Sequence, residues 1–141
     1  MRPPHTATLY LRPAEGAPWH RTVLRGVFLE EVRGASPGPD GASDAGDTRL
    51  WVPFGTPAAA PDGTARHYMP PAEFLALDAP ADAYTLVPGG TTGMADCFFL
   101  RGESTLPGEA AILRPDAVRV RRVAVRDWGN EALRHFEVTG R

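Results

Sequence analysis

The stretch that decides the fold is residues 19–32, which read WHRTVLRGVFLEEV. Its apolar residues fall on both faces of an extended chain, which predicts a strand that is covered on both sides. Gly26 interrupts the middle of this strand, where a glycine usually marks a bulge or a sharp corner. A long strand with a corner is what a small barrel needs in order to bend from one side to the other. The stretch therefore favours a β-barrel.

Extended segments lie on both sides of this strand. Residues 6–12 alternate apolar and polar side chains, which is the two-residue period of a strand. Residues 48–54 follow the same pattern as far as Pro53, which has no N–H to donate and so places the strand at an edge or ends it. Shorter strands are expected at residues 84–87 and 96–101.

The last two strands, residues 118–126 and 133–139, are expected to form an antiparallel hairpin. Valine alternates with arginine in the first of them, but the phase slips at Arg121 and Arg122. One extra residue at that point is the signature of a β-bulge.

Glycine and proline contribute 15 residues each and collect between the strands. Residues 34–47 and 55–66 offer little that anchors in a core, and we expect flexible loop insertions there. The Pro-Pro start of residues 70–78 and the acid that follows it predict a short helix. The expected fold is therefore one all-β domain over residues 1–141, a small antiparallel β-barrel of about six strands with long irregular loops and one short helix.

Composition excludes several classes of protein. No run approaches the ~20 apolar residues of a membrane-spanning helix, so we expect no membrane association. The first residues lack the apolar core of a signal peptide. The lone Cys97 leaves no internal disulfide and no CxxC metal pair. All 15 basic residues are arginine, so the chain has no Schiff-base lysine and no P-loop lysine.

No arrangement of side chains in the sequence indicates catalysis. The 4 histidines are far apart, and Cys97 lies in an apolar strand, where a buried and inert thiol is expected. The serines lie outside any GxSxG motif. We therefore expect no enzymatic activity, no cofactor and no metal site.

Exposed aromatic and arginine side chains are the candidates for contact with a partner. Trp51 is expected on the face opposite its apolar neighbours, and Trp128 in the turn of the last hairpin, where a large ring finds little cover. The alternative that these rings fold back over their own barrel stays open. Arg119, Arg121 and Arg122 are expected to form a basic strand face that contacts a protein or phosphate.

Charge is unevenly distributed, although the formal net charge is only −2. Residues 30–100 hold three arginines and ten acids, whereas the segments before and after them are net positive. Asp40, Asp44 and Asp47 are expected in an acidic loop.

The order of segments resembles a family of small proteins from the structural-gene cluster of long-tailed bacteriophages and prophages. In architecture the chain is similar to the head-completion, or stopper, proteins of the phage neck. The segments that carry the resemblance are residues 19–28 (WHRTVLRGVF), 52–54 (VPF), 68–74 (YMPPAEF), 86–90 (LVPGG), 117–127 (AVRVRRVAVRD) and 133–140 (LRHFEVTG).

The resemblance implies a viral structural protein that forms a homo-oligomeric ring, a hexamer or dodecamer, as a head–tail connector. Its partners would be the portal and adaptor ring and the tail terminator or tail-tube proteins, and it would lie close to packaged DNA. It would reside in the neck of the virion, after assembly in the host cytoplasm. If the acidic middle with Asp40, Asp44 and Asp47 faces the channel of such a ring, its charge keeps DNA from adhering to the channel wall. The alternatives are another small neck or tail-completion protein or, from a different class, a monomeric β-barrel module that binds a ligand or peptide.

Overall fold

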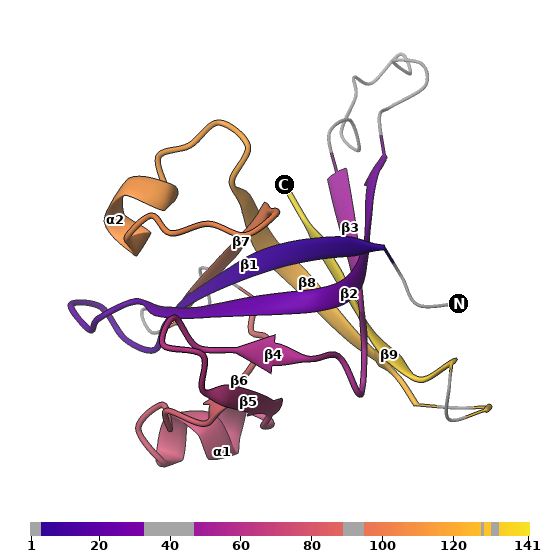
Figure 1. The fold of residues 1–141 in the computed structure, drawn as a ribbon, viewed down its shortest axis with the longest axis horizontal. Coiled ribbons are helices and arrows are strands. Elements are labelled where there is room, and N and C mark those ends of the chain that lie inside the picture. The colour runs from indigo at the N-terminus through magenta and orange to yellow at the C-terminus, as the bar shows by residue number, and fades with distance from the viewer. Residues whose placement is uncertain (1–3, 33–46, 89–94, 128, 131–132) are drawn as a thin grey trace.

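A computed structural model describes residues 4–32, 47–88, 95–127, 129–130 and 133–141. Strands dominate this part of the chain, and the helices are short (Figure 1). In chain order the elements are β1 (His5–Arg12), β2 (His20–Val32), β3 (Asp47–Pro53), β4 (Ala58–Ala59), β5 (Ala65–Tyr68), α1 (Pro71–Ala76), β6 (Ala83–Tyr84), β7 (Asp96–Arg101), α2 (Gly108–Ala111), β8 (Val118–Arg126) and β9 (His135–Gly140).

Six of the described strands close into an antiparallel barrel. Their order around the barrel is β1-β7-β8-β9-β3-β2, and β2 pairs with β1 to complete the ring. The remaining strands leave the ring at β2, in the order β4-β5-β6, and β5 runs parallel to β6. The expected all-β class and small antiparallel barrel are confirmed.

Barrel closure depends on a corner in β2. Residues 20–27 of this strand pair with β1, whereas residues 28–32 pair with β3. Gly26 lies where β2 changes partner and has a φ of +79°. It is the extra residue in the pairing with β1, because Arg25 lies opposite Thr6 and Val27 lies opposite His5. A residue with a Cβ loses about 1–2 kcal/mol in that left-handed conformation, which explains the glycine. The expected bulge or corner at Gly26 is confirmed.

The hairpin of β8 and β9 contains a second bulge. Val120 lies opposite Gly140 and Arg122 lies opposite Thr139, so Arg121 is the extra residue. Because of this insertion, Val120 and Val123 both pack on the inner core. The predicted hairpin and the predicted β-bulge at Arg121 and Arg122 are confirmed.

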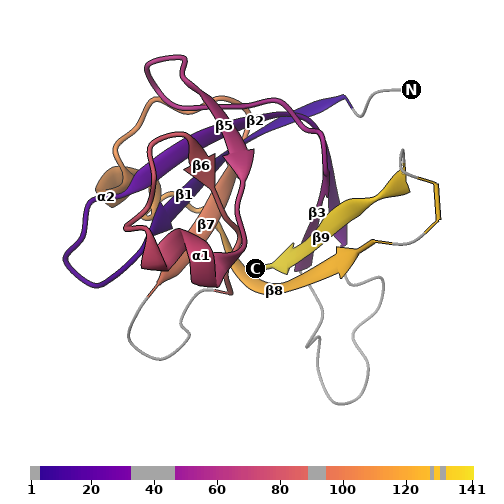
Figure 2. The same cartoon turned by 90° about the horizontal axis from the view of Figure 1, so that it is seen from below.

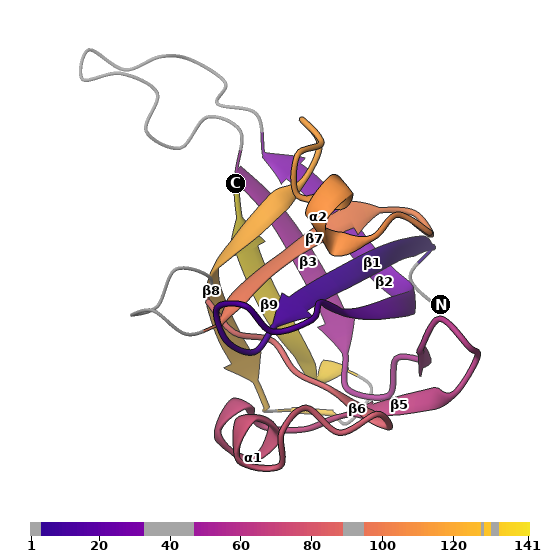
Figure 3. The same cartoon turned by 90° about the vertical axis from the view of Figure 1, so that its left-hand side faces the viewer.

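The interior of the barrel holds the main core, to which each of the six ring strands contributes side chains. The end of the barrel is covered by α1 and β6, through Phe74 and Tyr84 (Figure 3). His20 holds this cover in place, because its Nε2–H donates to the carbonyl oxygen of Ala83 (2.9 Å) and its ring packs edge-on against Phe74 (5.4 Å).

A second, smaller core lies outside the barrel wall, between α2 and the outer faces of β1 and β7. Tyr10 stacks on Phe98 with 4.8 Å between ring centroids, and Ala111 of α2 is buried with them. The phenol oxygen of Tyr10 donates to the carbonyl oxygen of Leu106 (2.9 Å) and contacts Ser104 Oγ (2.8 Å). The expectation of one helix is wrong, because the described residues hold α1 and, in addition, α2, which packing on this outer face stabilises.

The expectation of a flexible loop insertion over residues 55–66 is wrong in part, because two short strands interrupt the irregular backbone. Within it β4 pairs with β2, and β5 begins at Ala65 and pairs back on β4. Backbone hydrogen bonds make these pairings, so small alanine side chains suffice. The strand expected at 84–87 is limited to β6, Ala83–Tyr84, and the helix expected at 70–78 occupies Pro71–Ala76.

Residues 34–46 of the other expected loop lie outside the described part of the chain. None of the helices in the described part has the length and apolar character needed to span a membrane.

Close backbone packing at Gly140 gives a test of how tightly β9 packs against β8. A Cβ at this position would overlap the carbonyl oxygen of Arg119 and come within 2.8 Å of Val118 Cγ1. We expect Gly140→Ala to lower the free energy of unfolding by about 1–3 kcal/mol, because β8 must move away from β9. Chemical denaturation followed by tryptophan fluorescence measures this loss of stability.

The matched control is Gly55→Ala. The added Cβ meets nothing within 4 Å, so the substitution should change stability by less than about 0.5 kcal/mol. Equal stability of the two variants would contradict the packing described for β8 and β9.

Candidate functional site

Strand register brings aromatic and arginine side chains together on the outside of the barrel. Trp51 of β3 lies opposite Phe28 of β2. Arg49 lies two residues before Trp51 on the same face of β3. It lies opposite Thr139 of β9, which also lies opposite Arg122 of β8. Figure 1 shows β3, β9 and β8 side by side as one wall of the barrel. We call this surface the outer wall, and its defining residues are Phe28, Arg49, Trp51, Arg122 and His135.

A row of rings crosses the outer wall. His5 packs against Phe28 (5.5 Å between centroids), Phe28 meets Trp51 edge-on (6.5 Å), and Trp51 stacks on His135 at 4.4 Å with an interplanar angle of 14°. Two of these rings remain open to solvent, since Phe28 is 40% and Trp51 42% exposed. The row is therefore partly exposed apolar surface rather than core.

The ring of His135 is held in one orientation. Its Nδ1–H donates to the carbonyl oxygen of Leu133 (2.8 Å), and Nε2 is buried without a hydrogen-bond partner among the described residues. Trp51 therefore lies with one face against its own barrel and still exposes much of its indole. The sequence left open whether the Trp51 ring is presented to a partner or folds back over its own barrel. The structure shows some of each, because the ring stacks on His135 and is still 42% exposed.

The arginines of this region differ in how they are compensated. Arg119 pairs with Asp96 (3.2 Å), and Arg126 of β8 pairs with Glu137 of β9 (3.1 Å). Arg49, Arg121 and Arg122 are exposed. Arg49 lies directly opposite the exposed Glu30 of β2, whereas no acidic residue in the described part of the chain forms an ion pair with Arg121 or Arg122. Of the predicted basic strand face, Arg121 and Arg122 thus remain available for a partner, and Arg119 is already ion-paired.

The other predicted residues fall elsewhere. Trp128, Asp40 and Asp44 lie outside the described residues. The expectation of a loop position for Asp47 is wrong: it is the first residue of β3, is half-buried, and accepts a hydrogen bond from Arg141 Nε (2.9 Å). Its charge is compensated because the pairing of β3 with β9 brings it to the C-terminal end of the chain.

Sequence reasoning missed three members of the outer wall: Phe28, Arg49 and His135. The alternation of β3 carried a signal for Arg49, because it shares a face with Trp51. Phe28 and His135 belong to strands far away in sequence, so only the register of β3 against β2 and β9 identifies them.

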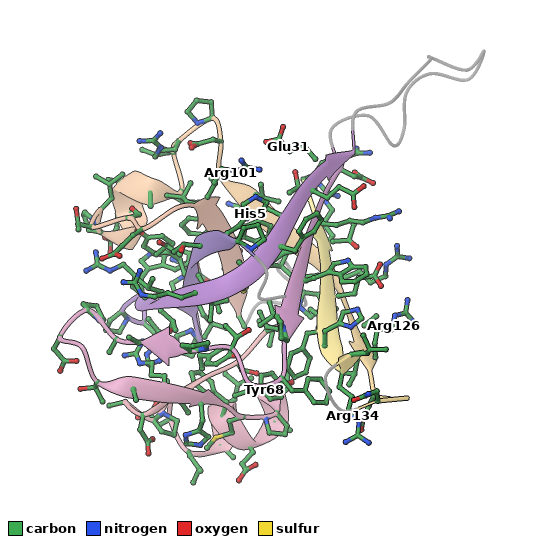
Figure 4. The ribbon with its side chains drawn as sticks, turned by 45° about the vertical axis from the view of Figure 1, so that its right-hand side comes forward. His5, Glu31, Tyr68, Arg101, Arg126 and Arg134 are labelled. Atoms are coloured by element: carbon green, nitrogen blue, oxygen red, sulfur yellow. The ribbon has the colours of Figure 1, made fainter. Side chains whose placement is uncertain are left out.

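An apolar groove opens near one end of the barrel and is a second candidate site. It has a volume of about 680 Å³, and its floor is aromatic, with Tyr68 and Phe54 lying 4.2 Å and 4.8 Å from the ring of Phe136. Figure 4 shows Tyr68 toward this end of the barrel, with Arg134 at the same end and Arg126 pointing away from β8. The residues that line the groove are Phe54, His67, Tyr68, Pro70, Pro71, Val125 and Phe136.

Side chains that could bind a metal ion are dispersed over the described residues. No group of three or more His, Cys, Asp or Glu side chains there is placed to hold a metal ion. Cys97 is fully buried inside the barrel, and this burial raises the pKa of its thiol to about 12.

Searches of family models, characterised proteins and solved structures find no match to this chain. The fold and the two surfaces described above are therefore the basis for any functional inference.

The buried thiol gives a test of how tightly the barrel is closed. Because its pKa is near 12, Cys97 stays protonated at neutral pH, and the barrel walls keep reagents from it. We expect alkylation of the native protein by iodoacetamide to be at least about 100-fold slower than alkylation in denaturing guanidinium chloride. Mass spectrometry reads the result directly, since the chain has 1 cysteine. Rapid and complete labelling of the native protein would contradict the closed barrel.

Proposed function

We propose that this chain is a non-enzymatic structural subunit of the neck of a long-tailed bacteriophage or prophage, a head–tail connector of the head-completion (stopper) type. Copies assemble into a homo-oligomeric ring through the outer wall. In the virion this ring joins the portal and adaptor to the tail terminator or tail-tube proteins and helps retain packaged DNA.

The observation that carries the proposal is the composition of the outer wall. Tryptophan and arginine are the residues most enriched at the energetic centres of protein interfaces. Here Trp51 and Phe28 are half-exposed on a rigid sheet. Arg49 lies one step along β3 from Trp51, opposite Glu30 of β2, and Arg122 lies on β8, opposite the same Thr139 as Arg49. A surface of this kind on a small domain favours contact with another protein over solvation.

The resemblance to phage neck proteins supports the same surface. Its most specific segments are residues 19–24 and the final hairpin, and the hairpin includes Arg122 of β8 and His135 of β9. These are strands of the outer wall, so the part of the sequence that resembles the neck proteins is also the part that presents the candidate interface.

A monomeric module that binds an apolar peptide or ligand is the second candidate function. The apolar groove favours it, because about 680 Å³ with aromatic walls is the size and lining of many ligand pockets. Self-association through the outer wall distinguishes the two functions, because a ring subunit requires it and a monomeric module that binds a ligand in the groove does not.

Sedimentation velocity and native mass spectrometry of the purified chain over a wide concentration range test the proposal. We expect ring-sized assemblies that Trp51→Ala weakens at least tenfold in dissociation constant, because the substitution removes a large interface side chain. The matched control is Leu113→Ala, which truncates a side chain that is 81% exposed, follows α2 and lies off the outer wall. A chain that stays monomeric at every concentration, or assemblies that Trp51→Ala leaves unchanged, would contradict the proposal.

A further inference from the structure

A pocket lined by arginine side chains lies away from the outer wall. It has a volume of about 390 Å³ and opens between β2, β5 and residues 106–109 at the start of α2. Figure 2 shows α2 and the turn between β1 and β2 at one side of the molecule, with β3 and β9 of the outer wall at the other. We call this site the arginine pocket, after Arg21 and Arg66 in its lining.

Arg66 of β5 is held in a fixed orientation in the lining of this pocket. Its Nε donates to the carbonyl oxygen of Ala81 (2.9 Å), and its Nη1 donates to the carbonyl oxygen of Arg21 (2.5 Å) and to Thr22 Oγ1 (2.8 Å). A guanidinium has five N–H groups, and these bonds use those of Nε and Nη1. The N–H groups of Nη2 have no partner within the described residues, so they remain for a ligand.

Arg21 of β2 is held in a similar way. Its Nη1 donates to the carbonyl oxygen of Leu106 (3.2 Å), which also accepts a hydrogen bond from the phenol of Tyr10 (2.9 Å). Neutral oxygen atoms therefore bind both guanidinium groups. No acidic side chain in the described part of the chain forms an ion pair with Arg21 or Arg66, and so contact with a carboxylate does not neutralise their charge.

The acids near these arginines are exposed to solvent. Glu109 of α2 lines the pocket, and Asp62 acts on Arg66 through longer-range attraction without an ion pair. Arg66 itself is partly buried, and this burial lowers its pKa because the charged form loses hydration. Burial also lowers the pKa of His20, whose ring is therefore neutral at pH 7 and adds no charge. Since water and salt screen exposed charges most strongly, the partly buried arginine dominates the field inside the pocket.

The remaining lining is apolar and firmly packed. The indole of Trp19 meets Phe98 edge-on (5.2 Å between centroids) and lies under the guanidinium of Arg12 (5.0 Å). Gly108 of α2 packs so closely on this indole that an added Cβ would overlap it. Three prolines complete the apolar wall: Pro18, Pro61 and Pro107. One wall of the pocket thus suits an anion and the other suits an apolar ring.

We propose that the arginine pocket binds a small anion that carries an apolar ring. The phosphate or carboxylate group lies against Arg21 and Arg66, and the ring lies against Trp19 and the prolines. Guanidinium groups bind both kinds of anion through paired N–H···O bonds. The volume of about 390 Å³ is within the range of small-ligand pockets. This site is separate from the outer wall and does not depend on the proposed ring.

Isothermal titration calorimetry of the full-length protein at pH 7 and low salt tests the site with four probes. We expect phenyl phosphate and phenylacetate to bind at least about tenfold more tightly than benzyl alcohol, which has the ring without the charge. Inorganic phosphate, which has the charge without the ring, should bind at least about tenfold more weakly than phenyl phosphate. The ratio of the affinities for phenyl phosphate and phenylacetate shows whether the natural ligand is a phosphate ester or a carboxylic acid.

Substitutions in the lining locate the binding. Arg21→Gln and Arg66→Gln should each weaken the binding of phenyl phosphate at least about tenfold, because each removes a charged donor. Glu109→Gln should strengthen it about twofold or more, because it removes an acid from the lining at an exposed position. The matched control is Arg25→Gln, which removes an exposed arginine of the same strand that pairs with Glu103 outside the pocket (2.6 Å). This control should bind within about twofold of the parent chain.

Benzyl alcohol that binds as tightly as the aromatic anions would overturn the proposal, because the arginines would then play no part in recognition. Absence of binding by both aromatic anions up to about 10 mM would also overturn it. Arg21→Gln and Glu109→Gln keep the test decisive if Arg66→Gln does not fold, since affinities that both of them leave unchanged would place the anion elsewhere on the protein.

Discussion

The structure depends on one backbone constraint, the corner of β2 at Gly26. A single strand must pair with β1 along its first part and with β3 along its last, and these neighbours lie in different directions. A left-handed φ of +79° makes the change of direction, and the bulge keeps Leu24, Val27 and Leu29 all on the inner core despite the extra residue. Without this corner, β2 could not pair with both β1 and β3, and the sheet would stay open.

Barrel closure links the fold to the proposed function. In a closed ring β3 is paired on both sides, so its outward residues stand on a rigid support between β2 and β9. That support fixes Trp51 between Phe28 and His135, and it sets the spacing of the arginines on either side. The same closure leaves one end of the barrel to be covered by α1, whose Phe74 joins the main core.

The sequence predicted those features that a local pattern determines. Gly26 and the phase slip at Arg121 each indicate a bulge because an interrupted alternation can be read within a few residues. The helix α2 was missed because its four residues, Gly108–Ala111, show no helical period and owe their position to packing on β1 and β7. The hairpin of β4 and β5 was mistaken for a loop because backbone pairing to β2 needs no apolar side chains. His135 joins Trp51 only through the register of two strands that are distant in sequence, which no local pattern contains.

The most direct test of this account compares the free energy of unfolding of Gly26→Ala with that of Gly16→Ala. Both glycines have a φ near +80°, at 79° and 82°, so both substitutions carry the same intrinsic cost of about 1–2 kcal/mol. Gly16 lies in a surface turn where an added Cβ meets nothing within 4 Å, and this turn is able to relax. We expect Gly26→Ala to lose at least about 2 kcal/mol more than Gly16→Ala, because the strain also opens the pairing of β2 with β1 or β3. Equal losses would contradict the claim that the corner at Gly26 closes the barrel.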